Sequence, residues 1–236
     1  MSGLARNNDD ETVFNNLIYT EYKEFVYPKF VRYLDFELRL ATYGCRHASF
    51  CGTGHDVGEN IGIYTLNTAL FSFGGTRGPD GHPINDEKLL RIETRRLCKW
   101  LQETDFVYKI LVMHHPMNHL IGWAEAQLGQ IISRSFDLVL QGHVHMPNAR
   151  YVDTGITRTV ICTAPPLFTR KNEILGYTVI DVSPSSGSIE LRYRQSSQAL
   201  KFVAGSFFTG TDDGILKFGS NTEPERYRQP GAQEHS

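Results

Sequence analysis

Two adjacent histidines stand where an apolar run of the sequence ends. Residues 110–113 are continuously apolar, His114 and His115 follow them, and Pro116 comes next. A short continuous apolar run predicts a strand buried on both faces. Proline donates no hydrogen bond to a sheet and restricts the residue before it, so the strand stops there and a loop begins. Because open α/β sheets place ligands at the carboxyl ends of their strands, His114 is a candidate ligand.

A second pair of histidines follows another apolar run. The segment 138–145 reads LVLQGHVH, and its first three residues predict a second buried strand. His143 and His145 lie two residues apart, a spacing that puts both imidazoles on the same side of an extended segment. A neutral imidazole nitrogen is a good ligand for a divalent transition metal. The two segments together predict that His114, His143 and His145 bind metal.

These motifs resemble the C-terminal signature of the calcineurin-like metallophosphoesterases, in which an apolar strand ends in His-His-Pro and Gly-His-x-His follows. The resemblance covers roughly residues 58–195. It implies a site for two divalent metal ions of the Mn, Fe or Zn type, with His114 and His143 on one ion and His145 on the other. It also implies that His115 lies outside the ligand shell. The implied activity is hydrolysis of a phosphoester by a metal-activated water.

The glycine of the second motif has a predicted backbone role. Gly142 precedes the histidine pair, and a glycine there lets the backbone turn or approach another segment closely. In the resemblance Gly142 is likewise a backbone requirement and not a ligand.

The N-terminal motifs of that family are Asp-x-His, Gly-Asp-x-x-Asp and Gly-Asn-His, and the chain lacks all three at the expected positions. The sequence Asp80-Gly81-His82 lies in a segment rich in glycine and proline, which predicts a turn, and the pair Asn118-His119 follows the His-His-Pro motif. In the family these motifs supply the bridging carboxylate, an asparagine ligand and the histidine that donates a proton, so no catalytic residue is assigned. Three neutral imidazoles by themselves cannot neutralise two divalent cations.

We therefore expect a truncated phosphoester hydrolase that is weak or inactive by itself. One alternative is a non-catalytic remnant, or pseudoenzyme, that acts as an interaction module. Another is one half of a split enzyme, completed in trans by a chain that carries the absent carboxylates. The expected partners are a phosphoester substrate and a complementing N-terminal half, and an exposed sheet edge would favour self-association.

The remaining pattern predicts the α/β class, and the resemblance specifies the C-terminal half of an α/β/β/α four-layer sandwich. The apolar spacing over 11–40 predicts an N-terminal helical segment, and the glycine-rich stretch 44–60 predicts a loop. Strands are expected over 61–67, 160–162, 177–182 and 189–193, and helices over 119–135 and after a cap at Asn85 or Asp86. The turn sequence Pro184-Ser185-Ser186-Gly187 predicts that the last two strands form a hairpin. The closing run of strands predicts a second, more antiparallel sheet.

Three regions follow from these patterns. Residues 1–57 form a helical segment and loop, residues 58–195 resemble the C-terminal half of a metallophosphoesterase, and residues 196–236 form a terminal strand region and disordered tail.

Composition argues against an extended nucleic-acid surface and against a membrane span. The formal net charge of −2 predicts no extended nucleic-acid surface. No apolar run approaches the roughly 20 residues of a membrane span. The four cysteines do not have the spacing of a metal site. Cys98 and Cys162 lie in apolar segments, which predicts buried thiols. A cytoplasmic location is expected, where thiols stay reduced.

Overall fold

The structure of the 236-residue chain is a computed structural model. The part of the chain that it describes comprises residues 31–32, 51–72, 79–82, 85–153, 157–168, 174–197 and 201–219. The chain divides into two compact units, which are Met1–Val144 with Val152–Thr159 and His145–Tyr151 with Val160–Ser236.

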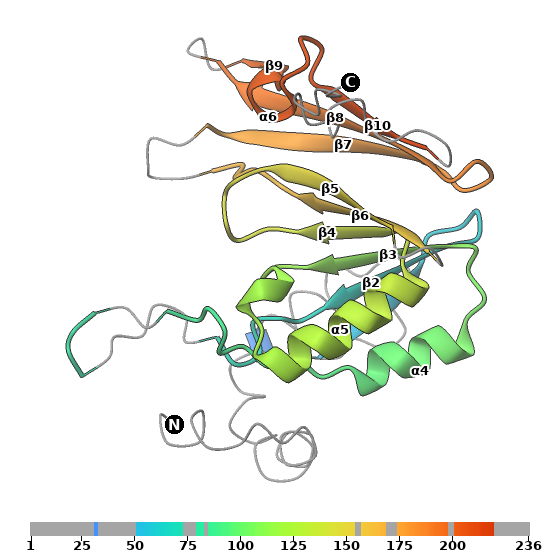
Figure 1. Cartoon of the computed structure of the whole chain (residues 1–236), viewed down its shortest axis with the longest axis vertical. Helices are drawn as coiled ribbons and strands as arrows, with labels where there is room; N and C mark the ends of the chain where they lie inside the picture. The colour runs from blue at the N-terminus through green and yellow to red at the C-terminus, as the bar shows by residue number, and fades with distance from the viewer. Residues whose placement is uncertain are drawn as a thin grey trace, which may run out of the picture. The chain divides into compact units, whose positions relative to one another are not determined.

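The first unit contains a sheet in which four strands follow one another in the order β1 (Gly52–Asp56), β2 (Ile61–Leu66), β3 (Tyr108–Met113) and β4 (Leu138–Gln141) (Figure 1). β1 pairs with β2 antiparallel, whereas β2, β3 and β4 are parallel to one another. Leu66 is in register with Met113, and Ile110 is in register with Leu138. The parallel strands therefore end along one edge of the sheet. Open α/β sheets place their ligands at this edge.

The core of the first unit lies around β3 and β4. Leu111 and Val139 are in register with each other and are fully buried, in agreement with the continuous apolar runs of both strands. The described helices of this unit include α4 (Arg95–Glu103) and α5 (Gly122–Ser135), and the single-turn helix η1 (Met117–His119) precedes α5. α5 buries Ala124, Leu128 and Ile132, a spacing of four residues that forms one helix face.

The second unit contains an antiparallel sheet in the order β10 (Ile215–Phe218), β8 (Ser188–Ser196) and β7 (Gly176–Ser183), and β9 (Phe202–Ala204) also pairs with β8. The short helix α6 (Ser206–Thr209) follows β9 (Figure 1). Gly187 has a φ of 64° in the turn between β7 and β8, a conformation that glycine adopts without strain. The predicted hairpin and the predicted second, antiparallel sheet are confirmed. Two further strands, β5 (Asn148–Asp153) and β6 (Arg158–Thr163), contain the boundary between the units.

One prediction was wrong at the start of the described region, because residues 52–56 form β1 and not a loop. Glycines in β1 and β2 are needed for packing. A Cβ on Gly54 would lie 2.3 Å from the Trp100 ring, and a Cβ on Gly62 would lie 2.3 Å from the Phe106 ring. Trp100 also packs on Tyr64 with a centroid separation of 5.4 Å. Glycine here permits close contact between a strand and bulky aromatic side chains.

The helix expected after Asn85 or Asp86 begins later, at Arg95. Leu90 is extended and forms an isolated parallel bridge with Leu120, which removes it from the helix. The buried Glu93 carboxylate accepts hydrogen bonds from the backbone N–H groups of Arg95, at 2.7 Å, and Arg96, at 3.5 Å. These bonds satisfy two of the N–H groups that a helix start leaves without partners, which explains why α4 starts at this point.

The predicted α/β class is confirmed, and the four-layer sandwich stays a prediction. Of the predicted N-terminal helical segment, only Val31 and Arg32 are described, as helical, and the predicted tail after residue 219 lies outside the described residues. Cys162 is buried as predicted, but Cys98 is only half-buried, and neither is in a disulfide. Among the described residues, no helix has the length and apolar character needed to cross a membrane.

Candidate metal centre

The candidate centre lies where the parallel strands of the first unit end. His114 and His115 directly follow β3, and His143 comes two residues after β4. The backbone carbonyl of His114 accepts a hydrogen bond of 2.9 Å from the N–H of Gly142, which joins the two loops. His114 and His143 thus lie together on loops that follow buried strands, and their role as metal ligands stays a prediction.

Three histidines converge in this centre. His114, His115 and His143 each offer one ring nitrogen, and the three atoms lie within 4.8 Å of one another. His143 Nδ1 and His114 Nε2 are 3.2 Å apart. Two nitrogens bound at about 2.05 Å to one tetrahedral ion would be about 3.3 Å apart. The pair therefore already has the separation that ligands of a single ion need, and the cluster could hold a metal ion.

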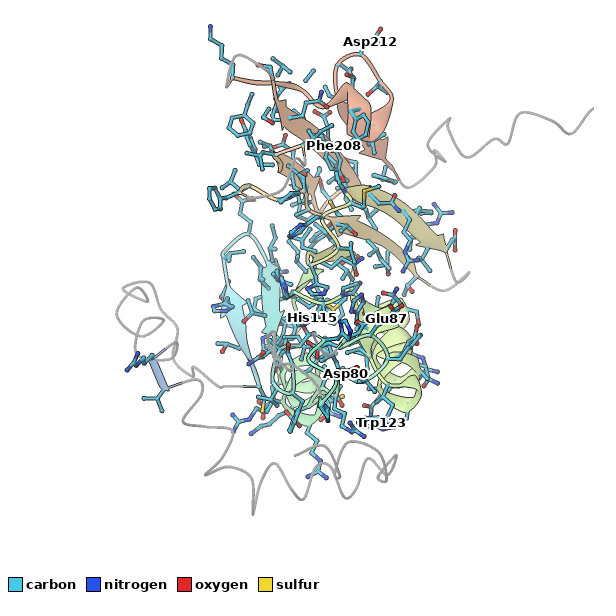
Figure 2. All side chains as sticks on the ribbon, turned by 90° about the vertical axis from the view of Figure 1, so that its left-hand side faces the viewer. Asp80, Glu87, His115, Trp123, Phe208 and Asp212 are labelled. Carbon is cyan, nitrogen blue, oxygen red and sulfur yellow. The ribbon has the colours of Figure 1, made fainter. Side chains whose placement is uncertain are left out.

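His115 is the buried member of the cluster, with 3% of its surface exposed. Figure 2 labels it among the side chains of the first unit. The pKa of His115 is lowered to about 4, first because burial removes water from the ring and next because a charge on His114 or His143 would repel a second charge. The ring is therefore neutral at pH 7, and a neutral imidazole keeps a lone pair for a metal.

The sequence placed His115 outside the ligand shell, but its ring belongs to the converging group. Its Nδ1 is 3.1 Å from Thr68 Oγ1, and its backbone N–H donates to the same oxygen at 2.9 Å. Because Nδ1 contacts the hydroxyl of Thr68, Nε2 is the ring nitrogen that remains to bind a metal ion. His115 thus combines the packing role that the sequence favoured with a place in a cluster that could hold a metal ion.

The loop after β4 is not extended, contrary to the premise that placed His143 and His145 on one side. His143 has a φ of 70° and His145 a φ of 55°. Positive φ is uncommon for residues other than glycine, although histidine is enriched among the exceptions. His143 is exposed and belongs to the first unit, whereas His145 begins the second unit and is not among the three converging histidines. The role of His145 as a ligand stays a prediction.

The backbone of Gly142 approaches His114 closely, as the sequence suggested, but the position does not require glycine. It is not among the residues with positive φ, and a Cβ at this position would lie 3.6 Å from His114 Nδ1, an ordinary contact distance. The unusual backbone conformation falls on the histidines that follow it. The predicted turn at Asp80 to His82 is confirmed, because Asp80 Oδ1 accepts the N–H of His82 at 3.1 Å.

Sequence reasoning missed three neighbours of the cluster. The His119 ring centroid is 4.9 Å from that of His143, and its Nδ1 is buried without a hydrogen-bond partner among the described residues. The Asp86 carboxylate accepts a hydrogen bond of 2.5 Å from Ser72, and its charge acts to raise the pKa of His115. Thr68 binds His115 directly. Only Asn118-His119 carried a signal in the sequence, as an Asn-His pair close to the His-His-Pro motif.

Comparison with known proteins adds little to this geometry. No model of a protein family matches the chain, and no curated protein matches it. Among solved structures, the chain is similar to a novel phosphatase from Mycoplasma pneumoniae, with 11% identity and a TM-score of 0.31, over 79% of this chain and 63% of that protein. It is also similar to a hypothetical protein from Thermus thermophilus, with 13% identity and a TM-score of 0.30, over 75% of this chain and 64% of that protein.

The chain spans less than two thirds of the length of either protein. At these TM-scores the two likenesses do not decide the activity of this chain.

Proposed function

We propose that the first unit binds one divalent transition-metal ion through His114, His115 and His143, and that the loaded site hydrolyses phosphoesters. The observation that carries the metal site is the convergence of three ring nitrogens within 4.8 Å at the ends of parallel strands. The hydrolytic step is supported by the resemblance of the two histidine motifs to metallophosphoesterases.

The three imidazoles determine which ions fit. They are neutral nitrogen ligands, which suit Zn and Fe better than they suit ions such as Mg and Ca that prefer all-oxygen sites. Three protein ligands are also the usual number in a catalytic zinc site, where the fourth position is left for water or substrate. A bound ion would supply an activated water and would stabilise negative charge on phosphoryl oxygens. The chain's own part is to hold the nitrogens together in a partly desolvated site.

The second ion implied by the resemblance depends on residues outside this cluster. His145 remains its predicted ligand, and the described residues near the cluster offer one carboxylate, Asp86, that acts on His115. We therefore propose a single-ion site with weak hydrolysis by the chain alone.

The test measures metal binding and hydrolysis separately. The purified chain, stripped with a chelator, is titrated with Zn²⁺ or Mn²⁺ by calorimetry, and the loaded chain is assayed with bis-p-nitrophenyl phosphate. We expect one ion per chain and slow hydrolysis, and the His114→Ala variant should lose both. His82→Ala is the matched control, because His82 is exposed in a turn outside the cluster and should leave both unchanged.

Each other outcome removes a defined part of the proposal. A folded chain that binds no ion contradicts the metal site. Binding of one ion without hydrolysis overturns the enzymatic part and favours a non-catalytic module or a half-enzyme completed in trans.

A further inference from the structure

Thr68 and His115 occupy equivalent places beyond two paired strands. Leu66 at the end of β2 is in register with Met113 at the end of β3, and Thr68 and His115 each lie two residues further on. Thr68 is 1% exposed, and it meets His115 across 47 residues of sequence. The parallel pairing of the two strands therefore brings a buried hydroxyl to one edge of a buried imidazole.

The hydroxyl of Thr68 makes two contacts with the same histidine. Its Oγ1 accepts the backbone N–H of His115 at 2.9 Å, and it lies 3.1 Å from the ring Nδ1. A threonine hydroxyl has one proton and two acceptor lone pairs. Since one lone pair is used by the backbone N–H, either the other accepts Nδ1–H or the hydroxyl proton is donated to Nδ1.

Only one of these arrangements allows His115 to bind metal. If the hydroxyl donates to Nδ1, the neutral ring carries its proton on Nε2 and has no lone pair free for an ion. If Oγ1 accepts Nδ1–H, Nε2 is unprotonated and available. A 180° flip of the ring would replace Nδ1 with a carbon and lose the bond to Thr68, so the same contact also opposes reorientation. Metal-binding histidines commonly donate their other ring N–H to an oxygen acceptor in this way.

We propose that Thr68 is a positioning residue that accepts both the backbone N–H and the ring Nδ1–H of His115, and thereby presents Nε2 of His115 as a metal ligand. This inference rests on the proposed function for its metal step, but the tautomer of the ring is defined without any metal. It assigns a role to a residue that belongs to neither histidine motif.

The first experiment reads the tautomer in the metal-free chain. Long-range ¹H–¹⁵N correlation spectra of the ¹⁵N-labelled protein distinguish a ring protonated at Nδ1 from one protonated at Nε2, and His115→Gln assigns the signals. We expect the Nδ1–H tautomer in the unsubstituted chain and in Thr68→Ser. In Thr68→Val the signals should move toward a mixture of tautomers. A ring protonated at Nε2 in the unsubstituted chain would overturn the proposal.

The second experiment measures Zn²⁺ affinity. Thr68→Val keeps the side-chain shape but removes the acceptor, and we expect it to weaken binding by about 10–100-fold. Thr68→Ser should stay close to the unsubstituted chain. Thr159→Val is the matched control, because Thr159 is also 1% exposed and donates its hydroxyl to a backbone carbonyl, that of Phe136, at 2.7 Å. It should lower thermal stability without changing affinity.

The two experiments separate the failure of this inference from the failure of the proposed function. If the unsubstituted chain binds no Zn²⁺ but carries the Nδ1–H tautomer, the metal site is wrong and the selection of the tautomer by Thr68 stands. If it binds Zn²⁺ and Thr68→Val binds equally well, the metal site stands and the positioning role of Thr68 is wrong. If Thr68→Val does not fold, the spectra of the unsubstituted chain and of Thr68→Ser still decide the tautomer.

Discussion

The histidine segment after β3 and the one after β4 are held in place by different means. After β3, His115 is 3% exposed and has two hydrogen bonds to Thr68, so buried contacts define its position. After β4, His143 and His145 are exposed, and positive φ angles shape the loop. One segment depends on the core of the first unit, whereas the other depends on backbone conformation next to the boundary between units.

This difference separates two ways of weakening the site. Substitutions in the core that supports the β3 segment should weaken the site by lowering the stability of the first unit. Substitutions in the β4 segment should change metal binding and leave the fold intact, because the side chains there bury little surface.

The largest effect is expected for Leu111→Ala. Leu111 is fully buried in the middle of β3, and removing a buried leucine side chain costs about 2–5 kcal/mol because transfer energy is lost and a cavity remains. Chemical denaturation measures the free energy of unfolding. Val139→Ala, at the registered position of β4, removes fewer carbon atoms and should cost less. Equal costs would contradict the expectation that the cost follows the number of buried carbon atoms removed.

The second prediction compares the two histidines of the β4 segment. His143→Ala removes one of three converging ligands and should lower the Zn²⁺ affinity by about 100-fold or more, beyond the range for residues that only support a ligand. His145→Ala should lower it less. Both residues are exposed, so the circular dichroism and thermal midpoint of both variants should stay unchanged. A larger loss for His145→Ala would make His145 the stronger ligand and break the assignment to the three-histidine cluster.

The smallest effect is expected for Gly142→Ala. The added Cβ meets its nearest neighbour at 3.6 Å, so stability should change by no more than about 0.5 kcal/mol and metal affinity by no more than about twofold. Gly62→Ala is the contrasting variant, because its Cβ would lie 2.3 Å from the Phe106 ring. Thermal melts of both variants test the pair. A large loss for Gly142→Ala would show that the position requires glycine, as the sequence suggested.

Much of the fold was predictable because the signals were local. The apolar runs around Leu111 and Val139 are continuous, and a buried strand needs that pattern whatever its neighbours are. The turn sequence of residues 184–187, between two strand-like runs, predicted the hairpin of β7 and β8. The start of α4 was not predictable, since it depends on the pairing of Leu90 with Leu120 and on the buried carboxylate of Glu93.

The glycines show why local signals fail. In sequence, the glycines of residues 44–60 predict a loop, because glycine is common in turns and weak in strands. In the fold, Gly54 lies in β1, where the Trp100 ring occupies the space that a Cβ would need. A side chain that is close in space but distant in sequence leaves no mark on the local pattern.

By itself, the sequence determined the chemistry that is available: two histidine motifs after apolar strands, and hence His114 and His143 at one sheet edge. Only the tertiary structure decided which other groups join them. It brought the ring of His115 into the cluster, set Thr68 against it and placed His119 and Asp86 nearby. The physical reason is that strand ends are fixed by local hydrophobicity, whereas the partners of a side chain are fixed by strand register and loop packing between residues far apart in the chain.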